Sequence, residues 1–187
     1  MRVLALLSSA VVLLLPAAAA AQTSPLYRNT EHRFAVIFPG EPMARDITFS
    51  ARGGASVPAR QFYVEQGTDR YLVTVVHFPT GPAVDDQIVE HAAEQLRQRG
   101  EVRFQAAAPY DPGMPGRQLN VFESNGRQLR ASVYMADRRL TITEASAAVG
   151  DFPALQFEQS ITLIDANGDD LDRPNNNQEP RNFGCRR

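Results

Sequence analysis

The fold is decided by residues 115–135, which read PGRQLNVFESNGRQLRASVYM. Near the middle, Asn125-Gly126 predicts a type I′ turn, because such a turn needs positive φ at both central residues. After the turn, Leu129, Ala131 and Val133 alternate with polar residues, which is typical of a strand with one buried face and one wet face. The stretch therefore predicts an antiparallel hairpin.

The chain on either side extends this hairpin into a sheet with helices. A second turn at 136–138 and a strand at 139–145 complete a three-strand meander. Residues 71–76 are apolar on both faces, which indicates a central strand covered on each side. Four other strands are expected at 34–38, 46–50, 60–65 and 101–107.

Two segments show helical patterns. The first predicted helix covers residues 85–99. Asp85 or Asp86 is its expected N-cap, and Gly100 is the residue expected to stop it. Its apolar residues make one stripe that must lie on a sheet, and the stripe consists of Val84, Ile88, Val89, Ala92, Ala93 and Leu96. A shorter helix after Asp151 should bury Leu155 and Phe157, and its water-facing residues should be Gln156, Glu158 and Gln159. Together these elements predict an α+β domain, with an antiparallel meander sheet of about six to eight strands flanked by helices.

The chain divides into three parts. Residues 1–21 have a basic start, an apolar run and small residues before Gln22, as in a cleaved signal peptide. The apolar run is shorter than the ~20 residues of a membrane span, although an uncleaved N-terminal anchor is the alternative. Residues 22–164 form a single domain, and the polar composition of 165–187 predicts a disordered tail. We expect a periplasmic or secreted protein without a stable membrane span.

Composition limits the partners. The formal net charge is −2 and every basic residue other than histidine is arginine, without a basic stripe, which argues against nucleic acid and against anionic lipid. Cys185 is the single cysteine, so it cannot form a disulfide within the domain. It is either a free exposed thiol or the link of a disulfide dimer.

Several motifs resemble a group of small bacterial exported proteins of unassigned function. Residues 34–42, FAVIFPGEP, are similar to their F-x-V-x-F-P-G-x-P opening, and 114–118, MPGRQ, resemble their G-x-P-G-R-E strand start. Residues 130–140 and 157–161 are similar to their second hairpin and closing segment. Gln118 replaces an acidic residue of that pattern. The resemblance spans about 27–163 and implies a Mog/PsbP-like fold, in which a sheet with helices on both faces serves binding and assembly.

The candidate contact residues lie in the meander. Arg117, Arg130 and Arg139 could form an exposed row for an anionic partner or ligand, with Tyr134 as a further contact. The alternative is that they pair across strands with Glu123 or Asp137. Glu144 falls on the same side of its strand as apolar residues that should point inward. It is therefore either a buried carboxylate with a raised pKa, or it lies at the end of the strand where this side is exposed to water.

These residues favour binding over catalysis. No nucleophile–base pair or metal-ligand set is apparent, and no cofactor is expected. Residues 165–176 resemble a calcium loop in their first positions but lack its glycine and its final glutamate. We expect a non-catalytic domain that binds or helps to assemble a protein partner through a sheet edge or the 109–116 loop. The alternative is a small-molecule binding protein with a pocket between the 85–99 helix and the sheet, and a hydrolase ranks third.

Overall fold

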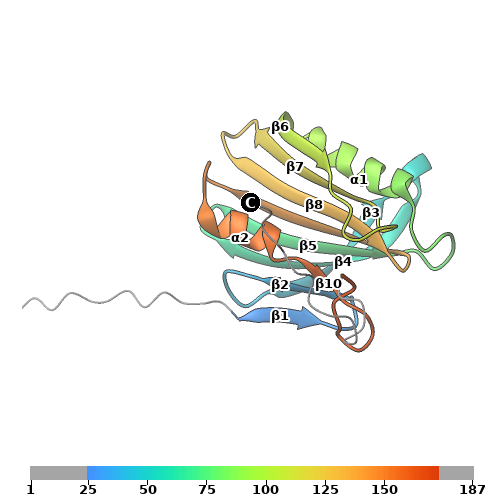
Figure 1. Cartoon of the computed structure of the whole chain (residues 1–187). Helices are drawn as coiled ribbons and strands as arrows, with labels where there is room; N and C mark the ends of the chain where they lie inside the picture. The colour runs from blue at the N-terminus through green and yellow to red at the C-terminus, as the bar shows by residue number, and fades with distance from the viewer. Residues whose placement is uncertain (1–24, 173–187) are drawn as a thin grey trace, which may run out of the picture.

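The arms on either side of Asn125-Gly126 form β7 (Gly116–Glu123) and β8 (Gln128–Ala136), and β9 (Arg139–Ala147) completes the expected meander. We describe these elements from a computed structural model of residues 25–172 (Figure 1). The meander lies inside a seven-stranded sheet of order β3-β4-β5-β9-β8-β7-β6, and every neighbouring pair is antiparallel. With two α-helices, the α+β prediction is confirmed.

The other strands of this sheet come in chain order as two hairpins and a returning strand. They are β3 (Met43–Ser50), β4 (Ser56–Gln66), β5 (Asp69–His77) and β6 (Gly100–Ala107). A short 3₁₀ turn, η1 (Arg52–Gly54), joins β3 to β4. The strand predicted to be central, β5, lies between β4 and β9 and is buried on both faces, as expected.

A second, three-stranded sheet holds the two ends of the described chain together. It consists of β1 (Leu26–Asn29), β2 (Phe34–Ile37) and β10 (Thr162–Leu163), with β2 in the middle. Figure 1 shows this sheet beside α2 (Phe152–Gln159), below β4 and β5 in the view. The long sheet therefore has a helix and a small sheet on one side, and α1 (Asp86–Arg97) on the other.

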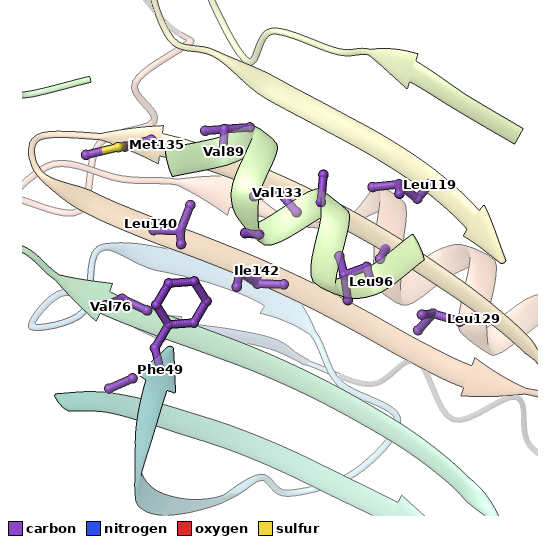
Figure 2. Close-up of a cluster of buried hydrophobic side chains, with 14 of the residues drawn as sticks. Phe49, Val76, Val89, Leu96, Leu119, Leu129, Val133, Met135, Leu140 and Ile142 are labelled. Atoms are coloured by element: carbon purple, nitrogen blue, oxygen red, sulfur yellow. The ribbon is translucent and has the colours of Figure 1, made fainter. Parts of the chain in front are cut away.

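The α1 side is one apolar core. Asp85 caps the helix by accepting a hydrogen bond from Gln87 N, and the buried stripe of α1 faces the meander. Figure 2 shows Val89 and Leu96 of α1 among side chains from β8 and β9, with Phe49 of β3 closing the cluster. The expected packing of this helix on the sheet is confirmed, except that Val84 precedes the helix and is exposed.

The long sheet curls around α1. The helix packs on β7 and β8, yet the end of β3 at the opposite side of the sheet also reaches it through Ser50. The Ser50 carbonyl oxygen accepts a hydrogen bond from Gln95 Nε2 at 2.7 Å and lies 2.9 Å from His91 Nε2. This contact closes the concave side of the sheet around the helix.

The other face holds an aromatic core. Phe34 and Phe38 from the β2 region pack with Phe62 of β4, Tyr71 of β5 and Phe157 of α2. Asp151 caps α2 as predicted, accepting from Ala154 N at 2.8 Å. These contacts bury the inner face of the small sheet and fix α2 against β8 and β9.

The turn between β7 and β8 differs from expectation. Gly126 has positive φ but Asn125 does not, so the hairpin does not use the predicted type I′ turn. Gly126 N donates to Glu123 O and Glu123 N to Arg127 O, which is a turn followed by a left-handed glycine. Positive φ at both central residues occurs instead at Asp137 and Arg138, between β8 and β9. The longer connection lets Asn125 adopt an ordinary conformation and leaves the left-handed position to glycine.

Two boundaries also move. Gly100 does not end the helix; α1 is capped at Gln98, and Gly100 is the first residue of β6. The domain expected to end at 164 continues to Asp172, because residues 165–171 fold back and Leu171 N donates to Leu163 O. Asp165 holds this turn by accepting backbone N–H bonds, a short-range interaction that offsets the low apolar content. The predicted signal peptide and Cys185 lie outside the described residues.

Candidate functional site

The five candidate residues of the meander do not form one row. Arg117 and Glu144 share the phase of core residues that pack on α1. Arg130 and Tyr134 alternate with the inward Leu129, Ala131 and Val133 of β8, so they face the α2 side. Arg139 is in phase with Thr141 and lies on the α2 side as well. The sheet therefore separates Arg117 from the other two arginines.

Arg117 attaches β7 to α1. Its Nε lies 2.9 Å from Glu90 Oε2 and its Nη2 lies 3.0 Å from a carboxylate oxygen of Asp86. The two acids are on the helix, so the pairing is not the cross-strand pairing with Glu123 or Asp137 that the sequence suggested. This guanidinium holds the first turns of α1 on the sheet.

Arg139 pairs with Asp137, one of the two expected acids, but within the turn and not across strands. Its Nη1 lies 2.7 Å from Asp137 Oδ2 and donates also to the Asp137 carbonyl oxygen. Asp137 is the first of the two residues in the turn between β8 and β9, and Arg139 is the first residue of β9. The contact therefore joins the turn to the strand that follows it and stabilises the left-handed backbone of the turn.

Arg130 has no ion pair with any residue in the described part of the chain. Its Nε is buried and has no hydrogen-bond partner there. Tyr134, two rungs along the same face, packs edge-on against Tyr110 with ring centroids 5.5 Å apart. Burial raises the pKa of Tyr134. Of the three candidate arginines, Arg130 is thus the one whose charge is not matched by any residue within 25–172.

Glu144 points inward, toward the end of α1. It forms an ion pair with Arg99, which follows the helix, and the other branch of Arg99 binds Glu123 at 2.6 Å. Burial raises the pKa of the Glu144 carboxyl above its ordinary value, although the nearby Arg99 acts in the opposite direction. The interpretation of Glu144 as an inward carboxylate is therefore correct. The single guanidinium of Arg99 forms ion pairs with both Glu144 and Glu123.

This ion-pair group continues across the strands. Glu123 accepts a hydrogen bond from Ser146 Oγ, and Arg127 contacts both Ser146 O and Asp69. No local pattern in the sequence indicates Arg99 or Arg127, because Glu144 and Asp69, with which they pair, are 45 and 58 residues away. The group links β5, β7 and β9 to the end of α1, which is a structural function.

Glu158 is the largest departure from the sequence prediction. Expected to face water, it is 2% exposed, and its Oε1 accepts hydrogen bonds from Gln118 Nε2 at 2.8 Å and from Ser132 Oγ. Its Oε2 is buried without a partner in the described residues. Glu158 is four residues after the buried Ala154, and that spacing is the signal by which this side of α2 could have been found.

Beside α2, the same face of the sheet is open. Phe104 of β6 pairs with Asn120, and Asn120 pairs with Arg130, so all three share the α2 side. Phe104 is 51% exposed and Phe122, two residues from Asn120, is 37% exposed. The Arg103 guanidinium lies 5.6 Å from the Phe122 ring centroid.

The loop before α2 adds to this area. Gly150 N donates to Gln128 Oε1, and Gln128 Nε2 donates to Asn120 Oδ1, which brings the loop beside β7 and β8. Val149 and Phe152, next to this contact, are 63% and 69% exposed. We call the surface formed by Phe104, Phe122, Arg130, Val149 and Phe152 the open sheet face.

Within residues 25–172, no three side chains of the His, Cys, Asp and Glu types gather as metal ligands would. Neither helix of that range has the length and apolar character needed to cross a bilayer. Comparison of the chain with protein-family models, with curated proteins and with solved structures finds no match.

Proposed function

We propose that this chain is a binding domain that docks a protein partner on the open sheet face. One observation carries the proposal. The α2 side of the long sheet is covered by α2 and the small sheet over β4, β5 and β9, whereas Phe104 and Phe122 on β6 and β7 are left exposed. Apolar groups that cluster on one exposed surface are typical of interaction sites.

The chemistry of the surface suits a protein. Aromatic residues and arginine are enriched where protein interfaces derive most of their affinity. Phe104, Phe122 and Phe152 supply flat apolar rings, and the partly exposed Arg130 lacks an ion pair with any described residue. A partner segment with apolar side chains around one carboxylate would complement this set.

The neighbouring strand edge contributes less. β6 is the last strand of the sheet, so its outer backbone groups could pair with a strand from the partner. Its register shifts between Val102 and Phe104, which leaves Arg103 as an irregularity in the edge. A bulge interrupts strand addition, and we therefore propose docking on the face of the sheet rather than extension of its edge.

The location of the protein and its fold family are proposals that rest on the amino-acid sequence. We infer that the domain works in the periplasm or outside the cell, because residues 1–21 have the regions of a signal peptide. We also infer a Mog/PsbP-like fold from the resemblance over 27–163. The antiparallel sheet with α1 on one face and α2 on the other supports that assignment. If the protein associates with itself, we propose that a disulfide between two Cys185 residues links the dimer.

A small-molecule site between α1 and the sheet is the second candidate. A hollow of about 250 Å³ lies there, with Glu90, Arg97 and Arg117 on its wall. These charges are already matched, since Glu90 lies 2.7 Å from Arg97 and 2.9 Å from Arg117. A ligand would have to separate ion pairs, so this hollow supports binding less well than the open sheet face.

Site-specific photo-crosslinking tests the proposal. A photo-reactive phenylalanine analogue is placed at position 104 of the full chain in its native host, and at Met43 as the matched control. Met43 is 56% exposed but lies on the opposite edge strand, β3. We expect one discrete crosslinked partner from position 104, lost in the Phe122→Ser variant and absent from position 43. Equal crosslinking from both positions, or none from 104, would contradict the proposal.

A further inference from the structure

A cavity of about 230 Å³ lies on the α2 side of the sheet, away from the open sheet face. It is bounded by the turn between β8 and β9, by β10 and by the final turn 165–171. Its apolar wall consists of Ala136, Leu163, Ile164 and Leu171. Three of these four side chains belong to the folded core, since Leu163 and Ile164 are 3% and 2% exposed and Ala136 is 9% exposed.

The polar wall has two acids, and both are already engaged. Asp137 pairs with Arg139 at 2.7 Å. Asp165 accepts the N–H groups of Asn167 and Asp169 at 2.8 and 2.9 Å, and these bonds hold the pKa of its carboxyl below the ordinary value. Neither acid needs a ligand to complete its interactions.

Two other polar residues of the wall have no such partner. Arg33 has no ion pair with a described residue, and its backbone carbonyl accepts from Ile164 N, which fixes it at the cavity. The Thr141 side chain has no hydrogen bond to a described residue, although Thr141 is only 3% exposed. Among the described residues, the wall therefore offers one cation outside an ion pair, Arg33, beside the paired Arg139, together with one hydroxyl and apolar groups, which suits an anion with an apolar body.

The backbone around the cavity is unusual. Within residues 25–172, the non-glycine residues with positive φ are Arg33 (64°), Asp137 (46°) and Arg138 (58°). Arg33 and Asp137 line the cavity, and Arg138 follows directly. Left-handed conformations are costly for side chains with a Cβ; at Asp137 and Arg138 they belong to the two-residue turn between β8 and β9, and Arg33 adopts one at the wall of the cavity.

We propose that this cavity binds a small apolar molecule that carries one carboxylate, with Arg33 and Thr141 holding the carboxylate and the leucine and isoleucine side chains holding the apolar body. The cavity volume of about 230 Å³ limits the ligand to a small body, such as that of the six-carbon fatty acid hexanoate. This site does not depend on the proposed partner surface, because none of its residues belongs to the open sheet face.

Titration of the full chain with hexanoate tests the site, followed by isotope-edited NMR of the amides of Leu163 and Ile164. We expect saturable binding, weaker by about fourfold for each methylene removed on going to butyrate. Arg33→Gln should weaken binding by about tenfold to a hundredfold, as the loss of a charge-assisted hydrogen bond does. Arg33→Lys should retain part of the affinity, and Arg103→Gln, at an exposed arginine elsewhere, should retain all of it.

Titrations with hexanol and with hexylammonium distinguish the contribution of the ligand's charge to binding from that of its apolar body. Binding of hexanol as tight as that of hexanoate, tighter binding of hexylammonium, or an unchanged affinity in Arg33→Gln with native amide shifts would overturn the proposal. Should Arg33→Gln fail to fold, Thr141→Val provides the second test, and unchanged affinity there would count equally against it. Phe122→Ser, which tests the partner surface, should leave hexanoate binding intact, so the two proposals can fail separately.

Discussion

Arg99 and Glu144 form an ion pair between the turn after α1 and the middle of the long sheet. The same guanidinium binds Glu123, so it faces two carboxylates whose side chains are 7% and 14% exposed. Removing the cation would leave both acids buried without a counter-charge.

We expect Arg99→Gln to lower the free energy of unfolding by about 3 kcal/mol, which is the order of cost when a buried pair loses one partner. Urea denaturation at pH 7 measures it. The control is Arg103→Gln, whose pair with Glu101 is exposed and should change stability by less than about 1 kcal/mol. Similar effects of the two substitutions would contradict the assigned role of Arg99.

The pKa of Glu144 predicts a pH dependence. Its pKa is raised in the folded protein, so the folded state binds more protons than the unfolded state above the ordinary glutamate pKa of about 4.3. The contribution of Glu144 to stability is therefore greatest at low pH and is lost as the pH rises through its raised pKa. Glu144→Gln removes this term, so the wild type should gain stability relative to the variant between pH 8 and pH 5. A relative gain in the other direction would refute the assignment.

Gly116 predicts a steric effect. A Cβ at this position would lie 2.2 Å from the Ala108 carbonyl oxygen and 2.5 Å from Tyr134 Cδ1, both too close for real atoms. Gly116→Ala should therefore lower the free energy of unfolding by about 2 kcal/mol, the usual cost of overpacking, and should change the tyrosine near-ultraviolet circular dichroism. Gly40→Ala is the control, because its Cβ would meet Val64 Cγ1 at an ordinary 3.6 Å. A wild-type spectrum and stability for Gly116→Ala would be inconsistent with this packing.

The turn between β8 and β9 and the turn between β7 and β8 predict opposite outcomes for a glycine substitution in each. Arg138 has φ of 58°, where glycine is not strained, so Arg138→Gly should raise the free energy of unfolding by about 0.5–1 kcal/mol. Asn125 has no positive φ, and its Oδ1 accepts from Arg127 N at 3.0 Å. Asn125→Gly should therefore lower stability by a similar amount. Thermal unfolding of both variants measures the contrast, and stabilisation by Asn125→Gly would instead favour a type I′ turn at 125–126.

The architecture could be predicted from local patterns. The alternation around Asn125-Gly126 and the stripe of α1 each depend on residues close in sequence, and both predict which side of an element is buried. The turn type could not be predicted in the same way. Asn-Gly permits several hairpin connections, and the choice between them depends on how many residues the strand register leaves for the turn.

The candidate sites were less predictable, because they are made by residues distant in sequence. The alternation of residues in β8 predicts that Arg130 faces away from the α1 core, and the structure confirms this placement. Arg99 belongs to no periodic pattern that would indicate its partners. Glu158 is a polar residue on a helix that is too short for its buried side to be recognised from periodicity. The cavity near Arg33 joins the first hairpin, the second turn of the meander and the final turn, a combination that only the folded chain brings together.

The contact between Ser50 and α1 also bears on self-association. An unpaired outer strand can recruit an identical chain and start a fibre. Here one outer strand, β3, is fixed to the protein's own helix at its last residue, Ser50, and the other, β6, is interrupted by its irregularity at Arg103. The border along β6 is therefore an uneven template for a second copy, and the end of β3 is occupied by α1.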